Sequence, residues 1–236
     1  MNKYQEFATA MDKFNNNIFY KNAGMVVSIV IICLQFISLY NVKWSTKIFS
    51  PMYLLYILII YIITDLFSGI VHMYMDNSDK YMSMAGPFIA AFHLHHKQPK
   101  YRDRSPFAVY FYESGTKYWL VLYLAGVIYL QKTYKLPLNI NFILVGIGIL
   151  SSISEVSHYL CHNSNSWLTK ILQKYYLLLP PKHHLMHHKK NNTNYAFMNG
   201  MTDPLLNIIA EKVYDGYVNN TDQHYKYYKK QTTNRT

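Results

Sequence analysis

The residues of this chain with the most evident capacity for chemistry are its eleven histidines, most of which stand in short clusters. The densest cluster reads HHLMHH, and its four histidines are His183, His184, His187 and His188. If this segment is helical, the first pairs with the third and the second with the fourth, because residues four apart project from the same side of a helix. Pro180 and Pro181 stand just before the cluster and would begin such a helix. Two pairs on adjacent faces are suited to metal atoms that lie close together.

Three other places in the sequence combine histidines with carboxylates or with one another. The first contains Asp65, His72 and Asp76, the second reads FHLHH with His93, His95 and His96, and the third contains Glu155, His158 and His162. Because residues three, four or seven apart share a helix face, the first and third sets would each project together from one helix. Neutral imidazole binds iron, zinc, copper and nickel, so the residue type alone does not choose the metal.

The number of histidines narrows the choice. Up to nine or ten imidazoles from four places exceed the ligands of a single zinc ion, whereas two irons with mainly nitrogen ligands would use them. The predicted metal ligands are His72, His95, His96, His158, His162, His183, His184, His187 and His188. For His93 and His162 a packing or interfacial role is an equally good explanation. We expect His224, in the polar segment near the C-terminus, to be an ordinary solvated residue.

Carboxylates near the histidines have a supporting role open to them. A carboxylate that accepts the second N–H of a metal-bound imidazole fixes the orientation of the ring. The residues predicted for this role, or as additional ligands, are Asp65, Asp76, Glu113 and Glu155, with His93 as a further possible ligand.

Apolar segments between these places predict an all-α, multi-pass membrane protein. A helix that crosses the ~30 Å hydrocarbon layer needs about 20 residues. Four segments are candidates: Met25–Val42, Pro51 to about Met75, the stretch between Lys117 and Lys132, and Leu136 to about Cys161. The third is short for a span unless it tilts or recruits preceding residues. We therefore predict about four transmembrane helices in a domain over 25–215, preceded by a cytosolic segment 1–24 and followed by a basic tail 216–236.

The charge distribution predicts the orientation. The net charge is +11, and 19 of the 23 Lys and Arg residues fall on one side of the predicted spans, leaving Lys43, Lys47, Lys132 and Lys135 in the two other loops. The positive-inside rule places the basic side, which also holds all the histidines, in the cytosol. No nucleic-acid-binding motif accompanies the charge, so we expect no nucleic-acid partner and a basic face against anionic headgroups instead. The two cysteines, Cys33 and Cys161, do not indicate a disulfide framework.

The order and spacing of these motifs carry a family resemblance over roughly Ile63 to Leu206. The motifs are TDLFSGIVHMYMDN, FHLHHKQP ending at Pro99, FYESG, SEVSHYLCH, LPPKHHLMHH and NYAFMNGMTDPL. They resemble the membrane histidine-box superfamily of fatty-acid desaturases and hydroxylases, and more closely the lipid desaturase family that includes Kua and plasmanylethanolamine desaturase. Two positions depart from the family pattern. Ser154 and Asn192 each stand where relatives have a histidine, and His162 would compensate for the first.

The resemblance implies an enzyme with two iron ions, cycling between Fe²⁺ and Fe³⁺, that uses O₂ and two electrons to remove two hydrogens from adjacent carbons of a lipid chain. In the plasmanylethanolamine desaturases that the motifs resemble, that chain is the alkyl group of an ether phospholipid, and the product is the vinyl ether of a plasmalogen. The partners implied are a phospholipid substrate and an external electron donor such as cytochrome b5 or ferredoxin, because no HPGG-type haem-binding segment is visible. In a eukaryote the location would be the endoplasmic reticulum membrane.

Two other functions remain open. An enzyme with the same iron site would desaturate or hydroxylate an acyl chain of a phospholipid. Alternatively, histidine-rich loops are natural in a non-catalytic membrane protein that binds or transports a transition metal. Transport favours polar groups in the middle of spans, whereas the ionisable groups here gather at span ends, so we expect the enzyme.

Overall fold

The computed structural model describes residues 1–98, 105–112, 117–164 and 166–228. All regular structure in these ranges is helical, as predicted. The elements are α1 (Lys3–Asn16), α2 (Ile18–Tyr40), η1 (Thr46–Phe49), α3 (Met52–Asn77), α4 (Gly86–Lys97), α5 (Pro106–Tyr112), α6 (Trp119–Thr133), α7 (Leu138–Ser152), α8 (Ser154–Asn163), α9 (Trp167–Lys174), α10 (Pro181–Lys189), α11 (Asp203–Val213) and η2 (Thr221–Gln223).

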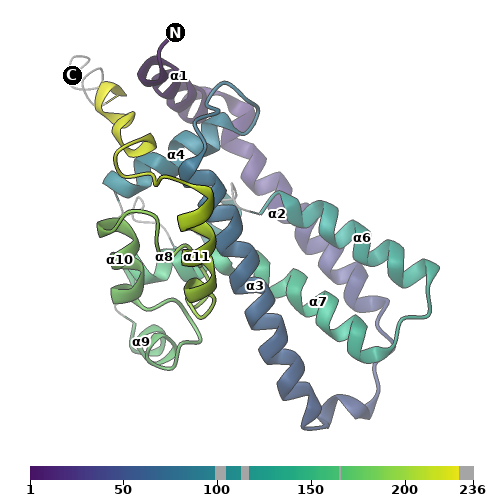
Figure 1. Cartoon of the computed structure of the whole chain (residues 1–236). Helices are drawn as coiled ribbons and strands as arrows, with labels where there is room; N and C mark the ends of the chain where they lie inside the picture. Colours follow the sequence, from purple (N-terminus) through teal and green to yellow (C-terminus); the bar gives the residue numbers. More distant parts are fainter. Residues whose placement is uncertain (99–104, 113–116, 165, 229–236) are drawn as a thin grey trace.

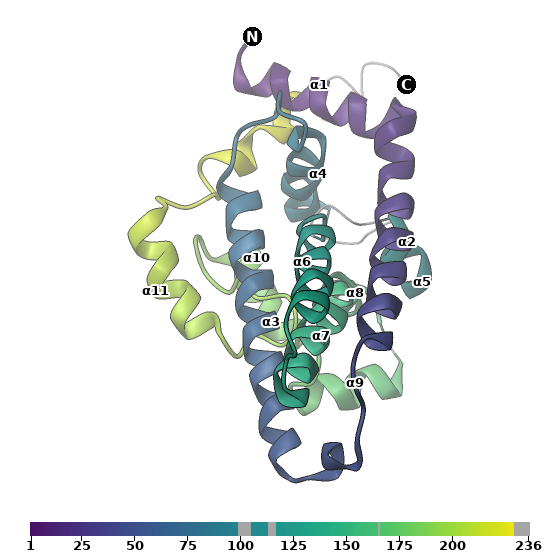
Figure 2. The same cartoon turned by 90° about the vertical axis from the view of Figure 1, so that its right-hand side faces the viewer.

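The helices divide into a long bundle and a cap (Figure 1). Helices α2, α3, α6 and α7 form the bundle, which extends away from both chain termini (Figures 1 and 2). Helices α1 and α4 lie at the end of the molecule that carries the termini, and α8 to α11 gather beside α3. Helices α1, α4 and α8 to α11 together are called the cap, which lies at the end of the bundle nearer the termini and beside α3.

Among the described residues, three helices are long and apolar enough to cross a membrane: Ile18–Tyr40, Met52–Asn77 and Leu138–Asn163, the last made of α7 and α8 in succession. Many of their large apolar side chains face outward. Leu54 of α3 is 71% exposed and Phe36 of α2 is 69% exposed, which is expected of surfaces that contact lipid. Three of the four predicted spans therefore meet the requirements of length and composition, and the chain fits a membrane protein.

The remaining predicted span corresponds to α6, which has 15 residues. At 1.5 Å per residue it is about 22 Å long, short of the ~30 Å layer. It packs between α2 and α7, where Leu120 and Leu124 meet Ile31 of α2, and Val127 meets Val145 of α7. Its burial against both neighbours explains why so short an apolar helix is stable.

The first span begins seven residues earlier than the apolar run suggested. The side chain of Asn17 accepts a hydrogen bond from the backbone N–H of Phe19, 2.8 Å away, and so caps α2 before its charged residue Lys21. A capping residue rather than hydropathy sets this end of the helix. The last span is interrupted at Ile153, which separates α7 from the histidine-bearing α8.

Two apolar clusters attach the cap to the end of α3. In one, Phe7 of α1 and Ile89 of α4 pack with Tyr81 and Phe197. In the other, Leu206 of α11 packs with Met73, Tyr195 and Tyr217. The segment around Tyr195 to Phe197 takes part in both clusters, and it passes directly beside His72 of α3.

Candidate metal centre

Nine side chains at the junction of bundle and cap form two groups that could each hold a metal ion. The five-histidine group consists of His95, His158, His162, His184 and His188, and the Asp76 group consists of His72, Asp76, His96 and His187. Within each group, one ligand atom from every residue lies within 4.8 Å of the others. The two groups are neighbours, since the rings of His96 and His188 are 5.2 Å apart and those of His184 and His187 also 5.2 Å.

Four helices supply these side chains, and two of them serve both groups. Helix α3 contributes only to the Asp76 group and α8 only to the five-histidine group. Helix α4 contributes His95 to the five-histidine group and His96 to the Asp76 group. Helix α10 contributes His184 and His188 to the five-histidine group and His187 to the Asp76 group. Successive residues on a helix project about 100° apart, so one helix that lies beside both groups reaches each of them.

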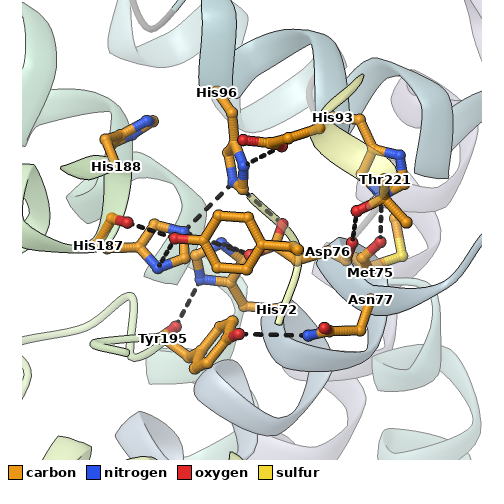
Figure 3. Close-up of polar contacts among 12 residues, drawn as sticks. His72, Met75, Asp76, Asn77, His93, His96, His187, His188, Tyr195 and Thr221 are labelled. Carbon is orange, nitrogen blue, oxygen red and sulfur yellow. Dashed lines mark hydrogen bonds and ion pairs between the residues drawn. The ribbon is translucent and has the colours of Figure 1, made fainter. Parts of the chain in front are cut away.

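The Asp76 carboxylate is the centre of its group (Figure 3). Its Oδ2 atom lies 3.0 Å from Nε2 of His72 and 3.3 Å from Nε2 of His187, and its Oδ1 atom lies 3.1 Å from Nε2 of His96. The Nε2 atoms of His96 and His187 are themselves 3.3 Å apart. Three nitrogens and two oxygens thus converge on one point.

The five-histidine group converges in the same way through ring nitrogens. Nε2 of His184 lies 3.0 Å from Nε2 of His158 and 3.1 Å from Nε2 of His188. The rings of His95 and His162 complete the group, with centroids 4.9 Å apart. When each metal–nitrogen bond is about 2.0–2.1 Å, two ligand nitrogens of one ion lie at most about 4 Å apart. The distances of 3.0 and 3.1 Å between Nε2 atoms are within that limit, so these nitrogens could share one ion.

The second ring nitrogen of four of these eight histidines, His72, His96, His158 and His187, is held by a fixed acceptor. Nδ1 of His72 lies 2.6 Å from the carbonyl of Tyr195, and Nδ1 of His187 lies 2.7 Å from the carbonyl of Thr193. A carbonyl only accepts, so these Nδ1 atoms carry the hydrogen and Nε2 keeps a free lone pair. Nδ1 of His158 lies 3.1 Å from the Glu155 carboxylate, as expected for a residue that orients an imidazole.

Buried polar atoms test whether these residues fit a metal. Within the described part of the chain, Nε2 of His162 has no hydrogen-bond partner, and Nε2 of His72 and both carboxylate oxygens of Asp76 have none besides the contacts of Asp76 with the histidines of its own group. A buried polar group left unpaired costs about 1–3 kcal/mol, and more when it is charged. Several such atoms facing one another in each group are explained by an ion between them, so the residues present fit two metal ions.

The protonation states also suit coordination. Burial, together with the nearby histidines, lowers the pKa of His188 to about 2 and places that of His95 and His184 well below the usual range. Burial and the neighbouring His72 likewise lower the pKa of His187 to about 4, against the opposing effect of Asp76. These rings are neutral at pH 7 and present lone pairs. His96 is the exception: burial acts downward, but the Asp76 and Asp222 carboxylates raise its pKa to about 10, so this ring must release a proton when it binds a metal.

An aromatic side chain that the sequence did not single out separates the groups from the apolar core. Phe197 is fully buried, and its ring stacks on that of His158 at 4.1 Å and lies 4.2 Å from that of His72. It therefore contacts one histidine of each group. Its position in the segment NYAFMN was visible in the sequence, but nothing distinguished it from an ordinary core phenylalanine.

Two predicted histidines lie outside both groups. His183 is outside both groups, with Nε2 2.5 Å from the Asp203 carboxylate. Its ring packs so closely on Gly200, which has a φ of +83°, that a Cβ there would lie 2.6 Å from Nε2. His93 lies between the hydroxyl of Tyr81 and the carbonyl of Met75, 2.8 Å from each. Glu113 and the motif residue Pro99 fall outside the described residues.

Asp65 has a structural role in the described residues. Its Oδ1 atom accepts backbone N–H groups of Asn199 and Gly200 at 2.9 and 3.1 Å, and its Oδ2 atom accepts the N–H and hydroxyl of Thr202 at 2.9 and 2.7 Å. The carboxylate therefore fixes the turn that follows Phe197. It lies on the same helix as His72 and Asp76 but serves a different part of the structure.

The prediction of a solvated His224 was wrong. The residue is 7% exposed, and its Nδ1 atom lies 2.6 Å from the hydroxyl of Tyr81. The polar composition of the surrounding segment suggested a free tail, but residues 217–228 fold back onto the cap. Asp222 of this segment, which the sequence did not single out, lies 2.8 Å from Nδ1 of His96. No periodic pattern or motif around Asp222 could have found it.

The two departures from the family pattern have different outcomes. Ser154 is buried, and His162, two turns further along α8, belongs to the five-histidine group. Asn192 instead organises a loop. With a φ of +55°, it donates to the carbonyls of Ala210 and Tyr214, 2.9 Å from each, and accepts from the hydroxyl of Tyr195 at 2.7 Å.

The fold and the two groups define a helical membrane protein with histidine-rich groups that could each hold a metal ion. Comparison with protein families agrees with this class: the model of the lipid desaturase domain matches residues 61–214. The chain therefore belongs to the lipid desaturase family, whose chemistry is that of an oxidoreductase. No curated protein and no solved structure gave a significant match.

Proposed function

We propose that the chain is a di-iron, O₂-dependent membrane lipid desaturase that introduces the vinyl-ether double bond of plasmalogens. The observation that carries the proposal is the pair of adjacent ligand groups built from α3, α4, α8 and α10 at the end of a membrane helix bundle. Mainly nitrogen ligands with one carboxylate suit iron, and two ions side by side suit the two-electron removal of hydrogen from a lipid chain. The family match supports the reaction class.

When bound, the two irons would supply the oxidation of the lipid chain by O₂. The protein's own residues hold and orient the metal ligands. The carbonyls of Tyr195 and Thr193 fix the rings of His72 and His187, so that Nε2 of each faces Asp76. Phe197 and the apolar clusters behind it keep water from the inner side of both groups.

The substrate, donor and location are part of the same proposal. The sequence motifs resemble those of plasmanylethanolamine desaturase, which supports an ether phospholipid as substrate. The electrons would come from a separate donor such as cytochrome b5 or ferredoxin. The excess of Lys and Arg on the histidine side supports a cytosolic orientation of the site, in the endoplasmic reticulum membrane if the source is a eukaryote.

The test is to express the chain in cells that lack plasmanylethanolamine desaturase activity and to measure acid-labile vinyl-ether lipids. We expect the unchanged protein to restore these lipids and His187→Ala to abolish them. His183→Ala is the matched control: it makes the same change in the same helix, but its side chain lies outside both groups, so most of the product should remain. A tagged chain in the same cells shows its location.

Other results would redirect the proposal. New double bonds or hydroxyl groups in acyl chains, without vinyl ethers, would replace the substrate but keep the iron site. Good expression with bound iron and no lipid change would contradict desaturase function. Bound zinc with no redox activity would favour a metal-binding or transport protein.

A further inference from the structure

We propose that Asp222 is a positioning residue of the Asp76 group, so that the metal centre extends beyond the family-matched segment into the chain that follows it. The match ends at residue 214, whereas Asp222 lies in η2. This inference rests on the proposed metal-dependent function. Asp222 orients the His96 ring and increases the strength with which that ring binds a metal.

The contact between the Asp222 and His96 side chains is buried. Oδ1 of Asp222 lies 2.8 Å from Nδ1 of His96, while Nε2 on the other side of the same ring faces Asp76 at 3.1 Å. Both side chains are almost inaccessible to water, at 3% and 2% exposure. The other carboxylate oxygen of Asp222 is 3.2 Å from Nζ of Lys97. Each oxygen of the buried carboxylate thus has a partner.

His96 differs in this respect from the other histidines of its group. Nδ1 of His72 and of His187 each face a neutral backbone carbonyl, whereas Nδ1 of His96 faces a carboxylate. A carboxylate behind a ligating imidazole fixes the ring and increases its basicity, and loss of such a partner typically lowers metal affinity about 10–100-fold. Asp222 is therefore placed to strengthen the one ligand of this group that lies on α4.

The segment that carries Asp222 is tied to the same group at two further points. The hydroxyl of Tyr217 donates to the backbone carbonyl of His187, and that of Thr221 donates to the backbone carbonyl of Asp76 at 2.5 Å. Within the segment, the N–H of Asp222 donates to the carbonyl of Tyr217 at 3.0 Å. Residues 217–222 therefore contact three of the four members of the Asp76 group, which an unattached polar tail would not do.

The experiment measures binding of ferrous iron to the purified full-length chain without oxygen, together with the melting temperature of the metal-free protein. We expect Asp222→Ala to weaken one of two sites about 10–100-fold and to leave the other, formed by the five-histidine group, unchanged. Asp222→Asn keeps an acceptor for the His96 N–H but removes the charge, so its loss should be smaller, about 10-fold or less. The melting temperature should change little in either variant.

Two controls separate positioning from a general effect of the substitution. Asp79→Ala makes the same change in a half-exposed carboxylate that pairs with Lys3, and both sites should bind as before. Lys97→Ala removes the other partner of Asp222 and should change the affinity by no more than about twofold, because Lys97 is partly exposed.

Three outcomes would overturn the inference. Unchanged iron binding in both Asp222 variants would exclude the role. Equal loss at both sites with a large fall in melting temperature would show that Asp222 only stabilises the fold. If Asp222→Ala does not fold, Asp222→Asn with unaltered affinity at both sites decides against the role. Failure of the unchanged chain to bind iron would instead count against the proposed function.

Discussion

At the scale of single residues, neutral buried imidazoles are the defining feature of this molecule. Desolvation lowers the pKa of His93 to about 4, although Asp76 acts in the opposite direction, and it is also the largest cause of the pKa of about 4 for His187 and about 2 for His188. An imidazole that stays neutral in the folded chain but protonates in the unfolded chain links stability to pH. The sign of that link can be predicted.

The metal-free protein should lose stability as the pH falls below about 6.5, the value at which these histidines protonate in the unfolded chain. Between that pH and the lowered folded-state pKa the unfolded chain binds more protons, at about 1.4 kcal/mol per histidine for each pH unit. His96, whose pKa is raised to about 10, acts oppositely, but only above pH 6.5. Melting temperatures from pH 7.5 to 5 measure the effect.

The metal-loaded protein is the comparison for this prediction. Bound metal occupies the ring nitrogens of the two groups in the folded state and adds its binding free energy, so the loaded form should stay folded at a lower pH than the metal-free form. If the melting temperature of the metal-free protein stays constant as the pH is lowered from 6.5 to 5, the buried, neutral state of these histidines is contradicted.

At the scale of elements, the sequence predicted the helices better than it predicted how they meet. The helix that begins at Pro181 was predicted from its two prolines and the spacing of HHLMHH, and it is confirmed. That His95 and His96 would divide between two groups was not predictable, because it depends on how α4 lies against α8 and α10. Asp222 was missed for a similar reason, since only the folded chain brings η2 to His96.

The turn after Phe197 gives an element-scale prediction. Asp65→Asn would turn an NH₂ group toward donors of the turn at residues 199–202, leaving part of this buried network unsatisfied. We expect the free energy of unfolding to fall by about 2–3 kcal/mol. Denaturation of the metal-free protein measures it. Asp79→Asn, at the surface, should cost less than about 1 kcal/mol. Equal stability of the two variants would remove the structural role of Asp65.

At the scale of the whole molecule, the bundle and the cap have different roles. Helices α2, α3 and α7 with α8 meet the requirements for crossing a membrane, while the cap closes over the end where the histidines lie. Hydropathy predicted these spans because a membrane demands long apolar segments. It predicted α6 less well, because this helix is buried between neighbours and does not need the length of an independent span.

The arrangement as a whole predicts two metal ions per chain, because α4 and α10 contribute ligands to both groups and so bring the groups together. The most direct test is the metal content of the purified protein, measured together with O₂-dependent turnover of an ether phospholipid. We expect two irons per chain and turnover that requires both O₂ and an electron donor. A single metal ion per chain, or zinc without O₂ consumption, would contradict it.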